Sequence, residues 1–467
     1  MKALTRALLV ISTFTPALAI DVVLDNHGSD CRADSVKQAA STVAYGLMKY
    51  YTGNNTGDNP GNLPDPYYWW EAGAMFGTMI DYWFITGDTS YNEVTSQAVV
   101  HQASETRDFM PKNQTRTEGN DDQGFWVLAA MSAAENKFPD PPADKPQWLS
   151  LSQAVFNQFA RRWETADCGG GLRWQIFQFN SGYNYKNSVS NGCFFNLASR
   201  LARYTGNSSY ADWADKIWDW GANVGLIGKE FQIFDGVNIP GNGQPCDNVN
   251  TNEWSYNLGL FIHGAAVMYN LTSNDVWKQR LDGLLKHAQN HFLKDGIIYE
   301  PHCELHGICD LNPRSFKGYF LRWLAGAMKM APHIRDISYP VIRTAAERAA
   351  ASCTGSPGPP AFKGHPGTAC GFTWIEKGKF DSSVGVGEQM NALDALMYSM
   401  MDVVEPPFTE KTGGTSKGDP SAAGSANDMD HLPSEKAITA GDKAGAAILT
   451  LILVGGLVGG TTVLLWD

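Results

Sequence analysis

The chain carries few charges and no basic stretch. Charged residues make up 18% of its 467 residues, and the formal net charge is −12. Proteins that bind nucleic acid concentrate lysine and arginine on one face or along one helix. An acidic chain without such a cluster therefore argues against nucleic acid as a partner. It fits a neutral, extracellular polymer better.

The sequence also lacks the patterns of common cofactor-dependent enzymes. No phosphate-binding loop occurs in it. Its nearest approach to a zinc site is His302 together with the stretch from Cys303 to Cys309. In an oxidising compartment a disulfide loop explains this stretch more simply than metal ligation does. We therefore expect neither a metal nor another cofactor.

Sustained alternation of apolar and polar residues is missing as well, which predicts that strands are few and short. The dominant spacing is helical and predicts an all-α domain over residues 20–405. Apolar residues recur three and four positions apart in twelve segments, namely 34–51, 68–86, 90–109, 122–136, 147–163, 188–205, 208–226, 253–271, 274–293, 315–331, 336–352 and 386–403.

A turn pattern recurs between these predicted helices. The stretch from Ile85 to Tyr91 resembles that from Tyr204 to Tyr210, and residues 270–274 are a looser version. Each ends one helix with Gly or a substitute and caps the next, as a helical hairpin requires. Six hairpins favour an (α/α)6 barrel, with an open superhelical array as the alternative. Long loops should form a cleft at one end, and these are 52–67, 166–186, 228–252, 294–314 and 353–386.

Both ends of the chain carry targeting patterns. Residues 1–19 combine a basic start, an apolar run and an Ala-Leu-Ala end, which is typical of a secretory signal peptide. The hydrophobic segment 444–467 has no basic cluster behind it, which favours a removed GPI signal over a membrane-spanning helix. Between domain and tail, the polar segment 406–443 should be a flexible linker. The small residues expected at the GPI attachment region are Gly424, Ser425, Ala426 and Asn427.

The cysteines and glycosylation sequons fit this secretory route. Eight cysteines point to disulfides, and nearness in sequence favours pairing of Cys303 with Cys309 and of Cys353 with Cys370. Sequons also arise by chance, but here they fit an extracellular surface. They begin at Asn54, Asn113, Asn207 and Asn270.

Two acidic residues stand side by side only at Asp121 and Asp122, shortly before Phe125 and Trp126. Cleavage of a glycosidic bond needs one carboxyl to protonate the leaving oxygen and another to meet the positive charge at the anomeric carbon. Neighbouring carboxylates cannot both ionise easily, which raises the pKa of one of them toward the acid role. The alternative is that the pair caps a helix, where carboxylates accept N–H bonds and meet the dipole.

Aromatic and polar residues near this pair and near loop ends are candidates for holding a sugar. Aromatic rings offer a flat apolar face for a pyranose, although rings within helical periods are more often core residues. Amide, carboxylate and phenol groups can hydrogen bond to sugar hydroxyls. The candidates are Trp70, Glu71, Trp126, Trp174, Asn191, Asp235, Tyr256 and Asn257.

Five short motifs follow one another along the folded part of the chain. They are YWWEAGAM at 68–75, NDDQ at 120–123, NGCFFNLA at 191–198, YN at 256–257 and FKG at 316–318. Together they resemble glycoside hydrolase family 76, the endo-α-1,6-mannanase family, and specifically its GPI-anchored fungal cell-wall branch. The resemblance covers almost the whole folded region.

The resemblance implies an (α/α)6 barrel and retaining chemistry on α-1,6-mannosyl links. It implies that Asp121 is the nucleophile and Asp122 the general acid/base. Retention requires carboxyl groups about 5–5.5 Å apart, which neighbouring residues at the mouth of a helix can present.

Three functions follow from the resemblance and from the residues. The first is a transglycosidase at the plasma membrane that cuts the mannose-containing GPI core glycan of other proteins and passes them to cell-wall β-glucan. The second is a hydrolytic endo-α-1,6-mannanase with the same acids. The third is a non-catalytic glycan-binding wall protein in which the acid pair only caps a helix.

Overall fold

The computed structural model describes residues 20, 22, 29–241, 245–376, 378–423 and 440–464. Its contacts divide the chain into two units, Met1–Ser425 and Ala426–Asp467. The predicted signal peptide 1–19 and the predicted attachment residues 424–427 lie outside the described residues. The described part of the second unit is helix α13 (Ala440–Leu464). Among the described residues, no helix is long and apolar enough to cross a membrane.

Helices dominate the first unit, as the spacing of apolar residues predicted. Each predicted segment coincides with one of its α-helices. These are α1 (Ser29–Met48), α2 (Trp69–Thr86), α3 (Asn92–Gln102), α4 (Asn120–Glu135), α5 (Trp148–Arg162), α6 (Ser188–Thr205), α7 (Ser208–Asn223), α8 (Ser255–Thr272), α9 (Asp275–His291), α10 (Phe316–Met330), α11 (Arg335–Ser352) and α12 (Val386–Tyr398).

Helix α3 ends well short of its predicted end at residue 109. Its last residue is Gln102, and Ser104, Arg107 and Phe109 then have φ values of 65°, 58° and 57°. Left-handed residues cannot continue a right-handed helix. The apolar period of this segment therefore reflects burial in a turn, since Phe109 is fully buried.

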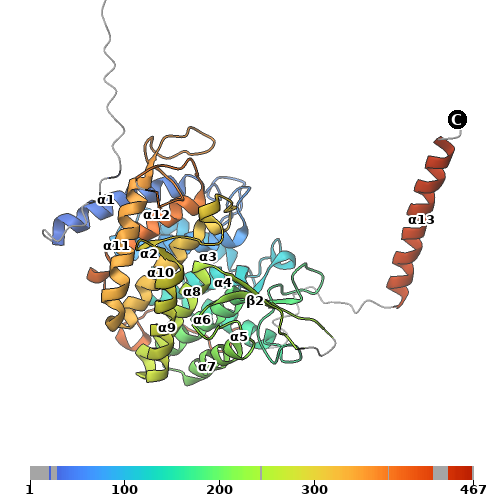
Figure 1. The fold of residues 1–467 in the computed structure, drawn as a ribbon, viewed down its shortest axis with the longest axis horizontal. Helices are drawn as coiled ribbons and strands as arrows, with labels where there is room; N and C mark the ends of the chain where they lie inside the picture. Colours follow the sequence, from blue (N-terminus) through green and yellow to red (C-terminus); the bar gives the residue numbers. More distant parts are fainter. Residues whose placement is uncertain are drawn as a thin grey trace, which may run out of the picture. The chain divides into compact units, whose positions relative to one another are not determined.

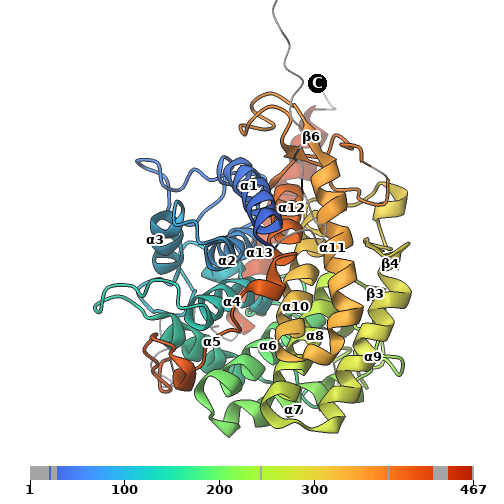
Figure 2. The same ribbon diagram turned by 90° about the vertical axis from the view of Figure 1, so that its left-hand side faces the viewer.

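The even-numbered helices pack side by side in chain order. Each of α2, α4, α6, α8 and α10 contacts the next even-numbered helix, and α12 contacts α2. The odd-numbered helices α3, α5, α7 and α9 each pack on the preceding even-numbered helix, while α1 and α11 pack on α12. Figure 1 shows the unit in one view, and Figure 2 shows the odd-numbered helices around the even-numbered set. The apolar core lies among these helices and includes Phe76, Trp126 and Tyr319, all fully buried.

The recurring turns close the helical hairpins as predicted. Helices α2, α6 and α8 are followed by the C-cap residues Gly87, Gly206 and Ser273, which have φ values of 79°, 71° and 53°. Such left-handed residues satisfy the last carbonyl groups of a helix. The following helices α7 and α9 are capped by Asn207 and Asn274, whose side chains accept an N–H bond from the first turn.

The strands in the described part are few and short, which also agrees with the prediction. Their bounds are β1 (Tyr185–Asn187), β2 (Phe234–Asn238), β3 (Val249–Glu253), β4 (Leu293–Lys294), β5 (Ile297–Ile298), β6 (Cys353–Gly355) and β7 (Ala369–Cys370). Strands β1, β2 and β3 form an antiparallel sheet in that order. This sheet joins two of the predicted long loops, 166–186 and 228–252.

Three disulfides form among the described cysteines. The predicted pairs Cys303–Cys309 and Cys353–Cys370 are both present. A third bond, Cys168–Cys246, joins residues 78 positions apart, which nearness in sequence could not indicate. Cys193 is a buried free thiol, so not every cysteine is paired.

The linker predicted to begin at residue 406 needs correction. Up to Ala423 the chain lies against the helical unit, because Phe408 N donates to Glu135 O at 2.7 Å. Leu149 N donates to Ser416 Oγ at 3.0 Å, and Asp419 N to Gln153 Oε1 at 2.6 Å. These hydrogen bonds hold a polar segment that has few apolar side chains of its own. Composition alone cannot reveal such bonds.

Candidate active site

Asp121 and Asp122 lie in the first turn of α4, where both sequence interpretations of the pair meet. Gly119 is the N-cap residue, and its N–H donates to Asp122 Oδ2 at 2.6 Å. The N–H of Asp122 donates to Asp121 Oδ1 at 3.1 Å. Carboxylates in the first turn satisfy helix N–H groups and meet the positive end of the dipole. The pair therefore caps the helix and, at the same time, faces a cavity.

The start of α4 is joined to the loop that precedes β1. Asn120 N donates to Trp174 O at 2.8 Å, and Asn120 Nδ2 donates to Arg173 O at 2.8 Å. Trp174 N donates in turn to Tyr185 O in β1 at 2.7 Å. The acid pair and the wall beside it thus form one hydrogen-bonded unit.

Next to the pair, the half-buried Arg162 is bonded to a cluster of buried polar side chains. Its guanidinium donates to the side-chain oxygen of Asn120, to Gln123 Oε1 at 2.6 Å and to Gln158 Oε1 at 2.9 Å. Glu118 is also buried, and burial together with the charge of Asp122 raises the pKa of its carboxyl well above the usual range. These bonds fix the backbone from which the catalytic candidates project.

The pair opens into a cavity of about 510 Å³. Among the described residues that line it, three are carboxylates, seven are aromatic and none is basic. An acidic, aromatic cavity suits a ring with hydroxyl groups and suits the positive charge that forms during glycosidic cleavage. The lining residues are Tyr68, Trp70, Asp121, Asp122, Phe125, Trp174, Gln175, Tyr185, Asn187, Val189, Asp235, Tyr256, Asn312 and Phe316.

Both carboxyl groups of the pair hold protons more tightly than ordinary aspartates. Burial, followed by the charge of Asp122, raises the pKa of Asp121 well above its usual range. Burial raises the pKa of Asp122 to about 6, against the lowering effect of the Gly119 N–H bond. The pair therefore keeps a proton to higher pH than isolated aspartates do.

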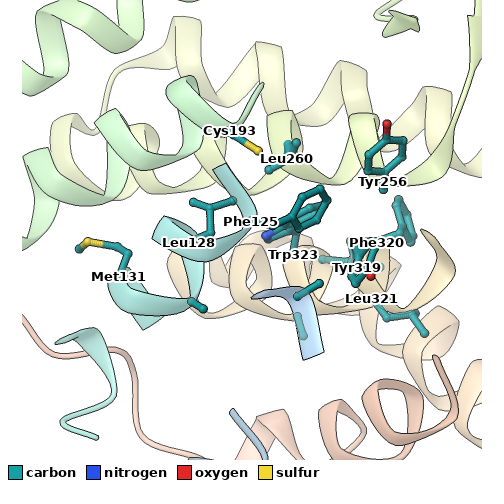
Figure 3. Packing of buried hydrophobic residues seen from close by; sticks show 14 of the residues in the cluster. Phe125, Leu128, Met131, Cys193, Tyr256, Leu260, Tyr319, Phe320, Leu321 and Trp323 are labelled. Atoms are coloured by element: carbon teal, nitrogen blue, oxygen red, sulfur yellow. The ribbon is translucent and has the colours of Figure 1, made fainter. Parts of the chain in front are cut away.

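Phe125 and its neighbours form an aromatic floor. Its ring centroid lies 4.7 Å from that of Trp70 and 5.3 Å from that of Tyr319. Tyr256 stacks on Phe316 with centroids 3.9 Å apart. Figure 3 shows Phe125 between Tyr256 of α8 and Tyr319 of α10. Rings from the four even-numbered helices α2, α4, α8 and α10 thus meet beside the acids.

Asp235 of β2 also lines the cavity. Its Oδ2 accepts from Tyr185 Oη at 2.6 Å and from Asn250 Nδ2 at 3.1 Å. Burial raises the pKa of this carboxyl, whereas the Tyr185 hydrogen bond lowers it. The sheet thereby fixes a third carboxyl group in the cavity.

Four of the candidate sugar-binding residues do not line the cavity. Trp126 is fully buried against Trp69, and its Nε1 donates to Trp69 O at 3.2 Å. Glu71 is fully buried too. Asn191 is buried; its Oδ1 accepts from Leu172 N at 2.8 Å, and its Nδ2 donates to Leu172 O at 3.0 Å. Asn257 is buried in α8. Their side chains project from the helices toward the core, so we correct these four predictions.

The remaining candidates, Trp70, Trp174, Asp235 and Tyr256, do line the cavity together with the acid pair. Sequence reasoning missed Asn187, whose Oδ1 accepts from Ser190 N at 3.2 Å and whose Nδ2 donates to Asp121 Oδ2 at 3.4 Å. An asparagine that follows a long loop and begins a helix is a detectable cap signal. Phe125, Asn312 and Phe316 were missed because they resemble ordinary helix and loop residues.

All four sequon asparagines are exposed. Asn54 and Asn113 lie on surface loops. Asn207 caps α7 through Oδ1, which leaves its amide nitrogen outside that bond. Asn270 Nδ2 donates to Met330 O at 2.9 Å, which occupies the atom that would carry a glycan. Within the described residues, no group of three or more His, Cys, Asp or Glu side chains could hold a metal ion.

Comparison with known proteins places the chain in an enzyme family. The model of glycosyl hydrolase family 76 matches residues 35–411. A mannan endo-1,6-α-mannosidase, DCW1 of Saccharomyces cerevisiae, is 45% identical over 95% of this chain and 94% of its own. DFG5, a mannan endo-1,6-α-mannosidase of the same yeast, is 40% identical over 98% of this chain and 96% of its own.

Solved structures agree. The crystal structure of Dfg5 from Chaetomium thermophilum in complex with glucosamine is 46% identical, with a TM-score of 0.79 over 85% of this chain and 97% of that one. An inactive variant of an α-1,6-mannanase of Salegentibacter, in complex with α-1,6-mannotriose, shares the fold. Its TM-score is 0.61 at 16% identity, and the match covers 78% of this chain and 99% of that one. As its motifs predicted, the chain belongs to glycosyl hydrolase family 76 and, within it, to the branch of the fungal Dfg5 and Dcw1 enzymes.

Proposed function

We propose that the protein is a retaining glycosidase that acts on α-1,6-mannosyl links, with Asp121 as nucleophile and Asp122 as general acid/base. The observation that carries the proposal is the position of this pair, which starts α4 and opens into a cavity rich in aromatic residues. The names of full-length relatives at 40–45% identity support the substrate, because they are mannan endo-1,6-α-mannosidases. We further propose that the six even-numbered helices close as the inner ring of an (α/α)6 barrel.

The proposed reaction has two steps. Asp121 attacks the anomeric carbon, the glycosidic bond breaks, and the leaving oxygen takes the proton of Asp122. An acceptor hydroxyl then gives its proton to Asp122 and displaces Asp121 from the anomeric carbon. Burial raises the pKa of both carboxyl groups, so the pair can supply the proton. A partly positive anomeric carbon beside Asp121 favours the ionised form of Asp121, which leaves the proton on Asp122 when substrate binds.

The finer proposal is a transglycosidase at the outer face of the plasma membrane. It cleaves the mannose-containing core glycan of GPI proteins and transfers them to cell-wall β-glucan. Its own GPI anchor would hold it there. Aromatic rings around the acids support transfer, because their apolar faces bind a sugar ring and favour it over water as the acceptor. The alternatives are a hydrolytic endo-α-1,6-mannanase and a non-catalytic glycan-binding wall protein.

The catalytic assignment is tested by Asp121→Asn and Asp122→Asn in the full-length secreted protein. Asn is nearly isosteric but can neither attack nor transfer a proton, so both variants should lose cleavage of α-1,6-mannotetraose by at least about a thousandfold. Asp275→Asn is the matched control, because Asp275 also begins a helix but is exposed on α9. Normal cleavage by either pair variant would contradict the assignment and favour a cap alone.

Transfer is tested with an α-1,6-mannosyl donor that carries the GPI core, with and without β-1,3-gluco-oligosaccharide. A transferase should form a donor–glucan product whose share rises with acceptor concentration. Free sugar as the sole product at every acceptor concentration would identify a hydrolase. Loss of both products in Asp121→Asn ties either outcome to the same site.

A further inference from the structure

A groove of about 580 Å³ lies between the end of α1 and the start of α3. The volume of this α1–α3 groove falls within the range of about 300–1,000 Å³ that suits a small ligand. Among the described residues, none lines both this groove and the active-site cavity. One lining residue is Asn54, which begins the sequon Asn-Asn-Thr at 54–56. An acceptor residue for an N-linked glycan therefore lines a groove that the proposed reaction does not use.

The lining of the α1–α3 groove suits an uncharged sugar. It includes Tyr45, Tyr51 and Tyr91, and Met48 and Val94 add apolar surface. One lysine and one glutamate among the described lining residues balance each other in charge. A tyrosine offers an apolar face to a pyranose ring and a hydroxyl group to its polar edge. The N-acetylglucosamine that begins an N-linked glycan fits this lining, because it is uncharged and carries both hydroxyl groups and an apolar methyl group.

The loop that carries Asn54 packs tightly on Tyr51. Gly61 N donates to Tyr51 Oη at 2.8 Å, which holds this phenol in place. A Cβ on Gly53 would lie 2.7 Å from Tyr51 Oη and 2.6 Å from Asn59 O, so glycine alone fits directly before Asn54. The attachment point thus stays close to an aromatic ring three positions earlier in the chain. A first sugar on a fixed attachment point loses little conformational entropy when it packs.

The other two tyrosines of the groove are held by neighbouring rings. Tyr45 stacks on His365, with ring centroids 4.4 Å apart, and Lys49 Nζ lies 4.6 Å from the centre of the Tyr45 ring. Tyr91 packs beside Tyr82, with centroids 6.2 Å apart. The aromatic surface of the α1–α3 groove is therefore formed before any glycan covers it.

Asn54 is the sequon asparagine best placed for a glycan that packs on the protein. Its side chain is exposed, and no described residue hydrogen-bonds to it. Asn270, by contrast, donates its amide nitrogen to Met330 O at 2.9 Å. Asn113, Asn207 and Asn270 do not line the α1–α3 groove.

We propose that the α1–α3 groove holds an N-linked glycan on Asn54, with the first N-acetylglucosamine packed against the groove tyrosines. The inference rests on the predicted secretory route and is independent of the proposed catalytic function. In the modification, Asn54 Nδ2 attacks C1 of the first sugar of an oligosaccharide carried on a lipid diphosphate. The C1–O bond to the diphosphate breaks, the lipid diphosphate leaves, and Nδ2 releases a proton. The packed sugar then removes apolar surface of the groove from water, which stabilises the folded protein.

Enzymatic release of the glycan from the folded protein tests the packing. We would secrete the full chain from a yeast, treat it with peptide N-glycosidase without unfolding, and follow release at Asn54 by peptide mass spectrometry. Gln97 is exposed and lines the groove, so Gln97→Trp fills the groove and displaces the sugar. Release should then be about tenfold faster than from the wild type, because the glycosidase needs the sugar outside the groove. His101→Trp, at an exposed position of α3 outside the groove, is the matched control and should behave like the wild type. An unoccupied Asn54, or equal release from Gln97→Trp and the wild type, would overturn the inference.

Thermal unfolding gives a second, independent readout. Asn54→Gln removes the glycan and should lower the Tm of the wild type, whereas the same change in the Gln97→Trp background should leave the Tm unchanged, because the sugar is already displaced there. Cleavage of α-1,6-mannotetraose by Asn54→Gln should stay within about twofold of the wild type, which separates this effect from catalysis. A fall in Tm of equal size in both backgrounds would overturn the packing of the glycan in the groove.

Discussion

Glu71 allows a quantitative test of how burial shapes the stability of this protein. It lies in α2 with no exposed surface, and neither of its carboxylate oxygens has a hydrogen-bond partner among the described residues. Burial, followed by the negative charge of Glu388, raises its pKa to about 8. The carboxyl group is therefore protonated in the folded protein at neutral pH but ionised in the unfolded chain.

The sign of the effect follows from linkage. Because the folded-state pKa is raised above the usual value of 4.5, the favourable contribution is complete below about pH 4.5 and is lost as pH rises through about 8. Each pH unit in this window costs about 1.4 kcal/mol. From about pH 5 to about pH 7.5, Glu71 should thus reduce the free energy of unfolding by about 3 kcal/mol.

Glu71→Gln removes the titration and keeps the shape of the side chain. The free energy of unfolding of the variant minus that of the wild type should grow by about 3 kcal/mol from about pH 5 to about pH 7.5, measured by urea unfolding. Other titrating groups largely cancel in this difference. Glu105→Gln, at an exposed carboxylate, should show no such growth. A difference between Glu71→Gln and wild type that stays constant with pH would refute the reasoning.

Three further predictions concern the acid pair, a buried ion pair and the Cys168–Cys246 disulfide. Since the pKa of Asp122 is about 6, the pair takes up a second proton below that pH. Below pH 6, kcat/KM for α-1,6-mannotetraose should therefore fall about tenfold per pH unit. A pH profile that stays flat would contradict this titration of the pair. Arg200 Nη2 lies 2.6 Å from Glu135 Oε2, and both side chains are buried. Arg200→Met leaves the Glu135 carboxylate buried and unpaired, so the free energy of unfolding, measured with urea, should fall by about 3–5 kcal/mol. The double variant Arg200→Met/Glu135→Leu should recover this loss of stability. Replacing Cys168 and Cys246 by Ser opens a loop of 78 residues and should lower stability by about 4 kcal/mol, seen as a fall in Tm; an unchanged Tm would contradict it.

Local sequence patterns were enough to predict most helices and their turns. The period of apolar residues and the Gly, Ser and Asn signals at 86–91 and 205–210 act within one or two helical turns, so neighbouring residues specify them. The end of α3 was missed because its apolar period continues into a left-handed turn. The segment 406–423 was missed because its hydrogen bonds join it to residues far away in the chain.

Part of the site could also be predicted, because some of its residues form a local sequence pattern. Asp121 and Asp122 were found because adjacent carboxylates are a local feature. Trp126 was assigned to the cavity as a neighbour of the pair, yet its ring is fully buried against Trp69, a contact between helices α4 and α2 that nearness in sequence does not indicate. Phe125, one position earlier, lines the cavity.

By itself the sequence determined the helical class, the hairpin turns, two of the disulfides and, through its motifs, the family. These depend on residues close in the chain or on the pattern of whole motifs. Tertiary structure alone decided which side chains reach the cavity, how Cys168 meets Cys246, and that Asn187 contacts Asp121. Such choices depend on helix rotation and on contacts between distant segments, and both are set only when the helices pack.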